Sequence, residues 1–119
     1  MTAANCPFCQ IVAGEAQAAI VFRSDRVTAF HDRQPVTPVH ILVIPNRHIE
    51  SVNDAGPEDR ELLGELIEVA GQIAREQGLG ERGYRLVFNH GADAGQTVRH
   101  VHLHLLGGRR MPFRFYGQE

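Results

Sequence analysis

His100-Val101-His102-Leu103-His104-Leu105-Leu106 is the stretch that decides the fold, because imidazole and aliphatic side chains alternate along it. Successive side chains of a β-strand point to opposite faces, so a strand over 99–106 places the three histidines on one face and the aliphatic residues on the other. Three histidines at strict alternation are improbable as incidental members of a solvated strand, since the chain contains only seven. The stretch therefore predicts a strand that presents a row of imidazoles to a site.

The row of histidines suits two kinds of chemistry. A metal site is one alternative, but three alternating histidines of one strand span about 13 Å, which is long for a single coordination sphere. Covalent catalysis accounts for all three rings, because a central imidazole can act as nucleophile while one neighbour holds its tautomer and another handles a proton. The row therefore favours an enzyme that forms a covalent intermediate on histidine.

Residues 39–45 predict a second strand, in the middle of the sheet. They read Val39-His40-Ile41-Leu42-Val43-Ile44-Pro45 and are apolar on both faces, which a strand tolerates only when both faces are covered. Proline helps to end the strand at Pro45. Shorter strands are expected over 20–23, 27–31 and 84–89, where β-branched and aromatic residues gather.

Two helices are expected. The longer one covers 57–77, where apolar residues recur at spacings of three and four, with Pro57 in the first turn and Gly78 just beyond the end. A short helix is expected from Asn5 to about Gly14. Two helices and about five mostly sequential strands predict an α+β fold with a largely antiparallel sheet, because only one long crossover helix is present.

Composition indicates one globular domain. The 119 residues are 43% hydrophobic and 22% charged, and they contain no repeat or linker-like tract, so a single domain over 1–119 is expected. All 12 basic residues are arginines and the net charge is -2, which argues against a nucleic-acid polymer as partner. No apolar run approaches the roughly 20 residues of a membrane span and no secretory signal begins the chain, so no membrane association and a cytoplasmic location are expected.

The loop before the histidine strand reads Asn89-His90-Gly91-Ala92-Asp93-Ala94-Gly95-Gln96-Thr97. Loops of small residues, amides and hydroxyls can turn backbone N–H groups toward an anion, although the same composition is typical of ordinary connecting loops. Because this loop directly precedes the row of imidazoles, we expect it to form a phosphate cradle.

The two cysteines, Cys6 and Cys9, form a Cys-Pro-Phe-Cys motif near the N-terminus. Cysteines so close in sequence make a poor structural disulfide, so metal binding or redox chemistry is expected. A dithiol redox motif normally follows a strand of a βαβ unit, and no strand is expected before residue 6. Metal binding is therefore favoured, since two thiolates and two histidines make a closed tetrahedral zinc site.

Residues 100–106 match in full the motif His-φ-His-φ-His-φ-φ, in which φ is apolar, and the chain thus resembles the histidine triad (HIT) family. The resemblance is closest to the nucleotide-binding, phosphoramidase branch, and it covers roughly residues 6–110 through the segments 29–32, 38–45, 89, 95–97 and 104–109. It implies a HIT-like α+β fold, with a five-stranded antiparallel sheet, two helices, and a homodimer in which the two sheets join.

The resemblance also implies an activity, the hydrolysis of purine nucleoside 5′-phosphoramidates of the AMP-amine type, without a metal in the reaction. His102 matches the nucleophile that forms a nucleotidyl-histidine intermediate, His100 and His104 match the flanking triad members, and His40 matches a fourth histidine that hydrogen-bonds the nucleophile. The positions that match nucleotide contacts are Phe30 in the base pocket, Asp32 at the ribose hydroxyls, and Asn89, Gly95, Gln96 and Thr97 at the ribose or phosphate.

Two other functions remain as alternatives. Gly95-Gln96-Thr97-Val98 also occurs in the branch that hydrolyses diadenosine polyphosphates, whereas Asn46-Arg47-His48 and Gly107-Gly108 favour the phosphoramidase branch. A nucleotide-binding regulatory module with little turnover is the second alternative, since family members also act as partners of other proteins.

The resemblance assigns the cysteines and the C-terminal tail as well. Superfamily members with this Cys-x-x-Cys motif complete a structural zinc site with residues that match His48 and His100. The tail over 111–119 lacks the Trp-Pro-Pro-Gly ending of eukaryotic phosphoramidases, which shapes the leaving-group preference from across the dimer. Its aromatic residues are either a replacement cap or exposed side chains of a frayed terminus: Phe113, Phe115 and Tyr116.

Overall fold

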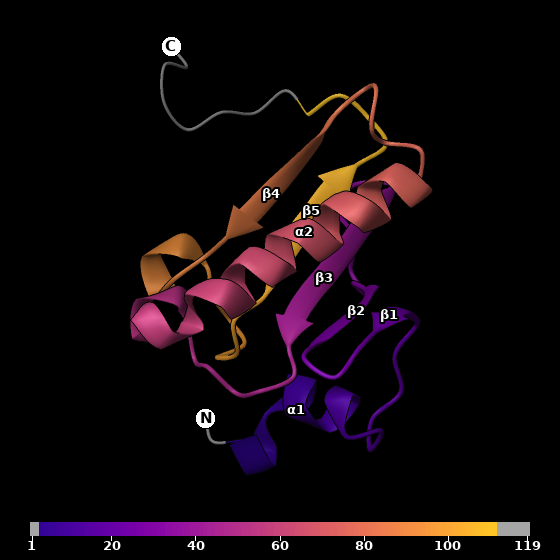
Figure 1. Ribbon diagram of the computed structural model, residues 1–119. Helices are drawn as coiled ribbons and strands as arrows, with labels where there is room; N and C mark the ends of the chain where they lie inside the picture. The colour runs from indigo at the N-terminus through magenta and orange to yellow at the C-terminus, as the bar shows by residue number, and fades with distance from the viewer. Residues whose placement is uncertain (1–2, 112–119) are drawn as a thin grey trace.

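Five antiparallel strands form one sheet in the computed structural model, which describes residues 3–111 (Figure 1). The strand order is β1-β2-β3-β5-β4, and the last strand along the chain therefore lies between β3 and β4. The strands are β1 (Ile20–Arg23), β2 (Val27–His31), β3 (Val39–Pro45), β4 (Tyr84–Phe88) and β5 (Leu103–Gly107). The helices are α1 (Pro7–Val12) and α2 (Arg60–Glu76), with short 3-10 turns η1 (Ala3–Asn5), η2 (Val52–Asp54), η3 (Pro57–Asp59) and η4 (Ala92–Ala94).

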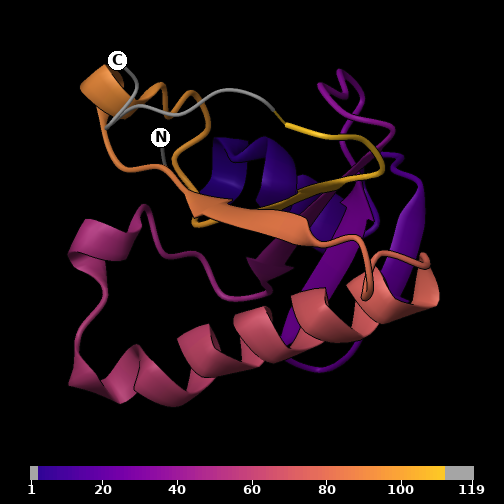
Figure 2. The same cartoon turned by 90° about the horizontal axis from the view of Figure 1, so that it is seen from above.

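The two helices cover opposite faces of the sheet (Figure 2). The α2 face carries the larger core, to which β3 contributes Ile41 and Val43. The α1 face carries a smaller cluster, to which β3 contributes Leu42 and Ile44. The prediction of a central strand covered on both sides is thus confirmed, and the α1 face is the one that bears the histidines.

The helix ends follow from local chemistry. Cys6 caps α1, because its sulfur accepts a hydrogen bond from the backbone N–H of Cys9, and Pro7 occupies the first turn. The backbone N–H of Gly56 donates to the carboxylate of Asp59, which also pairs with Arg47. These contacts, the Gly56 N–H first, lower the pKa of Asp59, so this carboxylate stays charged at the start of α2.

The predicted strand over 99–106 is shorter in the structure, where β5 begins at Leu103. In the β3–β5 register, Val43 pairs with Leu103, so the next hydrogen-bonded position would bring Pro45 opposite Val101. Proline has no N–H to donate, which ends the ladder there. The backbone N–H of Val101 instead donates to the carbonyl of Ile49, in the loop after β3.

The other boundaries differ by a few residues. The expected N-terminal helix ends at Val12 rather than near Gly14, which adopts a positive φ of 79°. The long helix is divided into η3 and α2, and β4 ends one residue before Asn89. Within residues 3–111, no helix has the length and apolar character needed to cross a membrane. The aromatic tail residues Phe113, Phe115 and Tyr116 lie outside the described part of the chain.

Candidate active site

A cavity of about 540 Å³ lies on the α1 face of the sheet. Two members of the histidine row line it, and its other walls come from α1, β2, β3 and the loop before β5. Side chains of the lining include His102, His104, Phe8, Phe30, Asp32, Leu42 and Thr97. The cavity thus combines an apolar wall with imidazoles and a carboxylate, which is typical of a small-molecule site.

His102 is held in one tautomer by its own chain. Its Nδ1 lies 2.7 Å from the backbone carbonyl oxygen of His100, so Nδ1 carries the proton and donates. The other nitrogen, Nε2, therefore keeps its lone pair, and no residue within 3–111 hydrogen-bonds it. Burial lowers the pKa of His102, and the hydrogen bond to the His100 carbonyl opposes this shift. The site therefore holds a neutral imidazole with a free basic nitrogen, as a nucleophile requires.

His104 and His40 form a second hydrogen-bonded pair. The backbone N–H of Val36 donates to His40 Nδ1 over 3.1 Å, so the proton of a neutral His40 sits on Nε2. That Nε2 lies 2.9 Å from His104 Nδ1 and 3.4 Å from a carboxylate oxygen of Asp32. His104 accepts at Nδ1 and consequently carries its own proton on Nε2. Burial, followed by the nearby His102 and His40, lowers the pKa of His104 to about 4.

The expected hydrogen bond from His40 to the nucleophile is therefore wrong. His40 hydrogen-bonds His104, and a backbone carbonyl orients His102. The strand register explains the difference, since Leu42 of β3 pairs with His104 of β5 and His40 is the diagonal neighbour on the same face.

The expected nucleotide-contacting residues divide into two groups. Phe30, Asp32 and Thr97 line the cavity, whereas Asn89, Gly95 and Gln96 do not. The Gln96 side chain shapes the loop instead. Its Oε1 accepts from the N–H of Gly91 and its Nε2 donates to the carbonyl of Glu50, at 3.0 and 2.8 Å.

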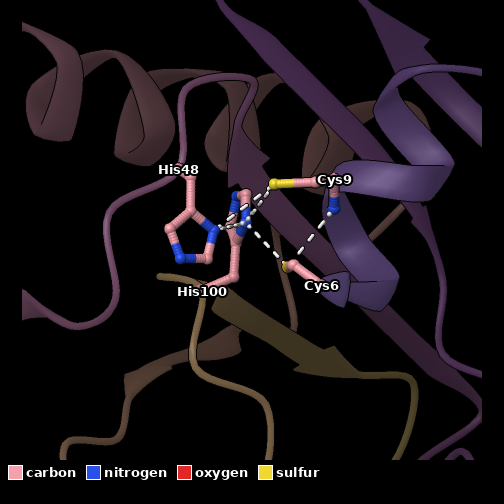
Figure 3. Close-up of side chains that lie close together, drawn as sticks. All are labelled: Cys6, Cys9, His48 and His100. Carbon is pink, nitrogen blue, oxygen red and sulfur yellow. Dashed lines mark hydrogen bonds between the residues drawn. The ribbon is translucent and has the colours of Figure 1, made fainter. Parts of the chain in front are cut away.

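The four expected metal ligands lie together beside the active site (Figure 3). Cys9 comes from α1 and Cys6 from the N-cap position just before it, whereas His48 comes from the loop after β3 and His100 from the segment before β5. The Nδ1 atom of His100 lies 3.3 Å from the sulfur of Cys6 and 3.5 Å from that of Cys9. The Nδ1 atom of His48 lies 3.3 Å from both the sulfur of Cys9 and the Nδ1 of His100. These four residues form a possible Cys2His2 metal-binding group.

The donor set fits zinc. Tetrahedral bonds of about 2.3 Å to sulfur and about 2.0 Å to nitrogen place ligand atoms roughly 3.3–3.7 Å apart. The four distances above lie in this range, and all four ligand atoms lie within 4.8 Å of one another. Pro45 supplies the outer contact, because its carbonyl oxygen lies 2.8 Å from His100 Nε2 and fixes the tautomer that leaves Nδ1 free. Burial first, then Cys6, raises the pKa of the Cys9 thiol to about 11, so a cation is needed to deprotonate it at neutral pH.

Comparison with known proteins places the chain in a family. A model of the HIT domain matches residues 13–111. The chain belongs to the HIT domain family. Among curated proteins, this HIT protein is 48% identical over 102 residues to the purine nucleoside phosphoramidase of Escherichia coli strain K12, with 86% of each chain covered.

Solved structures agree with the fold. A HIT family hydrolase from Legionella pneumophila superposes with a TM-score of 0.90 at 48% identity, covering 92% of this chain and 97% of the other. A histidine triad protein from Clostridium difficile superposes with a TM-score of 0.92 at 38% identity, covering 97% and 100%. The expected five-stranded antiparallel sheet with two helices is confirmed, and α2 is its main helix.

Sequence reasoning missed Phe8 as a site residue. The centroid of its ring lies 5.2 Å from the ring centroid of His102, 5.9 Å from that of His100 and 5.4 Å from that of Phe30, and each pair meets edge to face. Its position between the two cysteines was a usable signal, since a metal that held α1 on the sheet would also hold the intervening side chain there. Arg33 also lines the cavity and was not expected there.

Proposed function

We propose that this HIT protein hydrolyses purine nucleoside 5′-phosphoramidates through a covalent intermediate on His102. The supporting observation is the tautomer of His102, a residue of the cavity wall, whose Nδ1 donates to the His100 carbonyl and whose Nε2 lone pair has no hydrogen-bond donor among residues 3–111. The 48% identical relative is named a purine nucleoside phosphoramidase, which supports the same substrate class.

The proposed reaction has two steps. The Nε2 lone pair of His102 forms a bond to the 5′ phosphorus while the P–N bond breaks, and the departing amine takes a proton from a water molecule. The hydroxide that this leaves then forms a bond to the phosphorus, the bond from phosphorus to His102 breaks, and His102 regains its lone pair as the nucleoside monophosphate is released. The proton on His104 Nε2 is suited to a hydrogen bond with a phosphate oxygen, because His104 Nδ1 is occupied by His40.

The remaining pocket residues suit the nucleotide. We propose that Phe30 packs on the base and that Asp32 accepts hydrogen bonds from the ribose hydroxyls. Asp32 is partly exposed, and its Oδ1 already accepts from the N–H of Gln34 over 2.8 Å, which fixes the carboxylate for a ligand. Thr97 is proposed to contact the phosphate, and Gln96 to shape the loop. Contacts of Asn89 and Gly95 with the nucleotide rest on the family resemblance.

A substrate panel tests this proposal. Wild-type protein is incubated with adenosine 5′-phosphoramidate, diadenosine triphosphate and diadenosine tetraphosphate, and adenosine monophosphate release is followed by chromatography. The proposal expects the phosphoramidate to have the highest kcat/KM. Faster cleavage of the dinucleotides would assign the chain to the polyphosphate-hydrolase alternative, and binding of adenosine monophosphate without turnover would assign it to the regulatory alternative.

We propose that the Cys2His2 group binds structural zinc. A zinc ion at Cys6, Cys9, His48 and His100 would cross-link α1, the loop after β3 and the segment that leads to the nucleophile. Such a cross-link supplies stability and takes no part in the reaction. Elemental analysis of protein purified without chelator tests this: about one zinc per chain is expected, and a metal-free preparation that is stable and active would contradict it.

We also propose that the chain is a single domain, with its core over about 6–110, and that two such chains form a homodimer. We propose the cytoplasm as its location. Strand β4 lies at the edge of the sheet, where β5 is its one neighbouring strand within 3–111. Ile67 of α2 is 49% exposed and Tyr84 of β4 is 37% exposed. Sedimentation velocity of wild type and Ile67→Glu tests this interface: a wild-type dimer that the substitution dissociates is expected, and a wild-type monomer would contradict it.

A further inference from the structure

The cavity of about 540 Å³ that His102 and His104 line is called the nucleotide pocket here. A second cavity adjoins it at the end remote from these two histidines. Its volume is about 860 Å³, and it lies along β1 and the loop between α1 and β1. Neither His102 nor His104 lines it. The residues that it shares with the nucleotide pocket are Ile11, Ala16, Gln17, His31, Asp32 and Arg33. A nucleotide whose phosphorus lies at His102 therefore has this cavity at its nucleoside end.

Positive charge gathers in the second cavity. Arg23, at the end of β1, and Arg33, after β2, both line it, and no acid within residues 3–111 forms an ion pair with either. Asp32 is the one carboxylate of the lining, and its two oxygens face the N–H of Gln34 and the Nε2 of His40. Two guanidinium groups that have no ion-pair partner among residues 3–111 are suited to a phosphate, which arginine can bind through paired N–H donors.

The volume of the nucleotide pocket indicates which part of a ligand would reach the second cavity. The volume of that pocket, about 540 Å³, is within the usual range for a small-molecule site, so a nucleoside monophosphate does not need the second cavity. The group that reaches it must extend from the nucleoside. Asp32 and Arg33 line both cavities, so a substituent on the 2′ or 3′ oxygen of a ribose bound at Asp32 would have access to the second cavity.

We propose that the second cavity is a subsite for a second phosphate, carried on the 2′ or 3′ oxygen of the ribose. The preferred substrates are then nucleoside 5′-phosphoramidates that also bear a ribose phosphate, with the remaining ribose hydroxyl hydrogen-bonded to Asp32. This inference rests on the proposed function, because it takes the 5′ phosphorus to lie at His102.

Calorimetric titration at fixed low ionic strength tests the subsite, since salt screens exposed charges. The ligands are adenosine 5′-monophosphate, adenosine 2′,5′-bisphosphate and adenosine 3′,5′-bisphosphate. At least one bisphosphate is expected to bind about tenfold more tightly than the monophosphate. Arg23→Gln is expected to remove most of this advantage without changing the monophosphate affinity, because Arg23 lines the second cavity and not the nucleotide pocket. Arg82→Gln, which precedes β4 at the opposite sheet edge, is the matched control.

Three results would overturn the subsite. The first is equal affinity of wild type for all three nucleotides. The second is an effect of Arg23→Gln on the bisphosphate advantage no larger than that of Arg82→Gln. The third is a change in the ratio of guanosine to adenosine monophosphate affinity in Arg23→Gln and Arg33→Gln with no change in the bisphosphate advantage, since the arginines would then contact the base. Failure of the proposed function is distinct, because it appears as the absence of phosphoramidate hydrolysis by wild type, whichever of the three nucleotides binds most tightly.

Discussion

Replacing Phe8 with alanine tests whether the small cluster on the α1 face holds the nucleophile. Phe8 is 8% exposed, and its ring contacts Phe30, His100 and His102. Phenylalanine-to-alanine changes in closed cores cost about 3–5 kcal/mol. Because Phe8 also lines the open cavity, water can enter the vacated space, so we expect the low end, about 3 kcal/mol. For 119 residues at about 2.1 cal/mol/K each, this lowers Tm by about 12 °C.

The assay follows thermal unfolding and phosphoramidate turnover with zinc in excess, so that the proposed zinc site is filled in every variant. Phe22→Ala is the matched control, because Phe22 packs on the α2 face, away from the histidines. We expect both variants to lose stability but only Phe8→Ala to lose about tenfold in kcat/KM, since His102 loses a packing partner. A Phe8→Ala protein within 1 kcal/mol of wild type, or one that matches Phe22→Ala in turnover, would refute the reasoning.

Three further predictions concern metal, pH and packing. Chelation of zinc is expected to lower Tm of wild type but to leave a Cys6→Ser variant unchanged, as seen by calorimetry; equal shifts in both would contradict the metal site. Because the pKa of His104 falls from 6.5 to about 4 on folding, the unfolded chain binds more protons between these values. Stability is therefore expected to decrease as pH falls through this window, and less steeply in His104→Asn; parallel urea-unfolding profiles would count against this. Gly107→Ala places a Cβ 2.8 Å from a methyl carbon of Leu79 and is expected to lower the free energy of unfolding by about 1–3 kcal/mol. Gly64→Ala, whose Cβ has no neighbour within 4 Å, is expected to raise it by about 0.5–1 kcal/mol. Urea unfolding measures both, and the opposite order would be inconsistent with the packing.

Local patterns predicted the elements and the faces of the sheet. The alternation through His100, His102 and His104 correctly indicated that the imidazoles share a face, because Phe8 contacts two of them and His104 contacts His102. The apolar run of β3 correctly indicated a central strand, since helices cover both of its faces. Such patterns depend only on the geometry of one element, which the sequence determines directly.

Hydrogen-bond partners were harder to predict, because they depend on register between elements. The partner of His40 follows only once Leu42 is known to pair with His104. The start of β5 likewise depends on Pro45 lying opposite Val101, a position that no pattern in either segment specifies. Gln96 appeared suited to phosphate contact, but its amide is satisfied within its own loop and by Glu50, which lies far from it in sequence.

The most direct test of the account is to compare His102→Ala with wild type on adenosine 5′-phosphoramidate, while intact-protein mass spectrometry of rapidly quenched reactions looks for an adenylylated chain. We expect turnover and a transient adduct on His102 in wild type, and neither in a folded His102→Ala protein that still binds adenosine monophosphate. Turnover by His102→Ala near the wild-type rate, or an adduct on another residue, would contradict it.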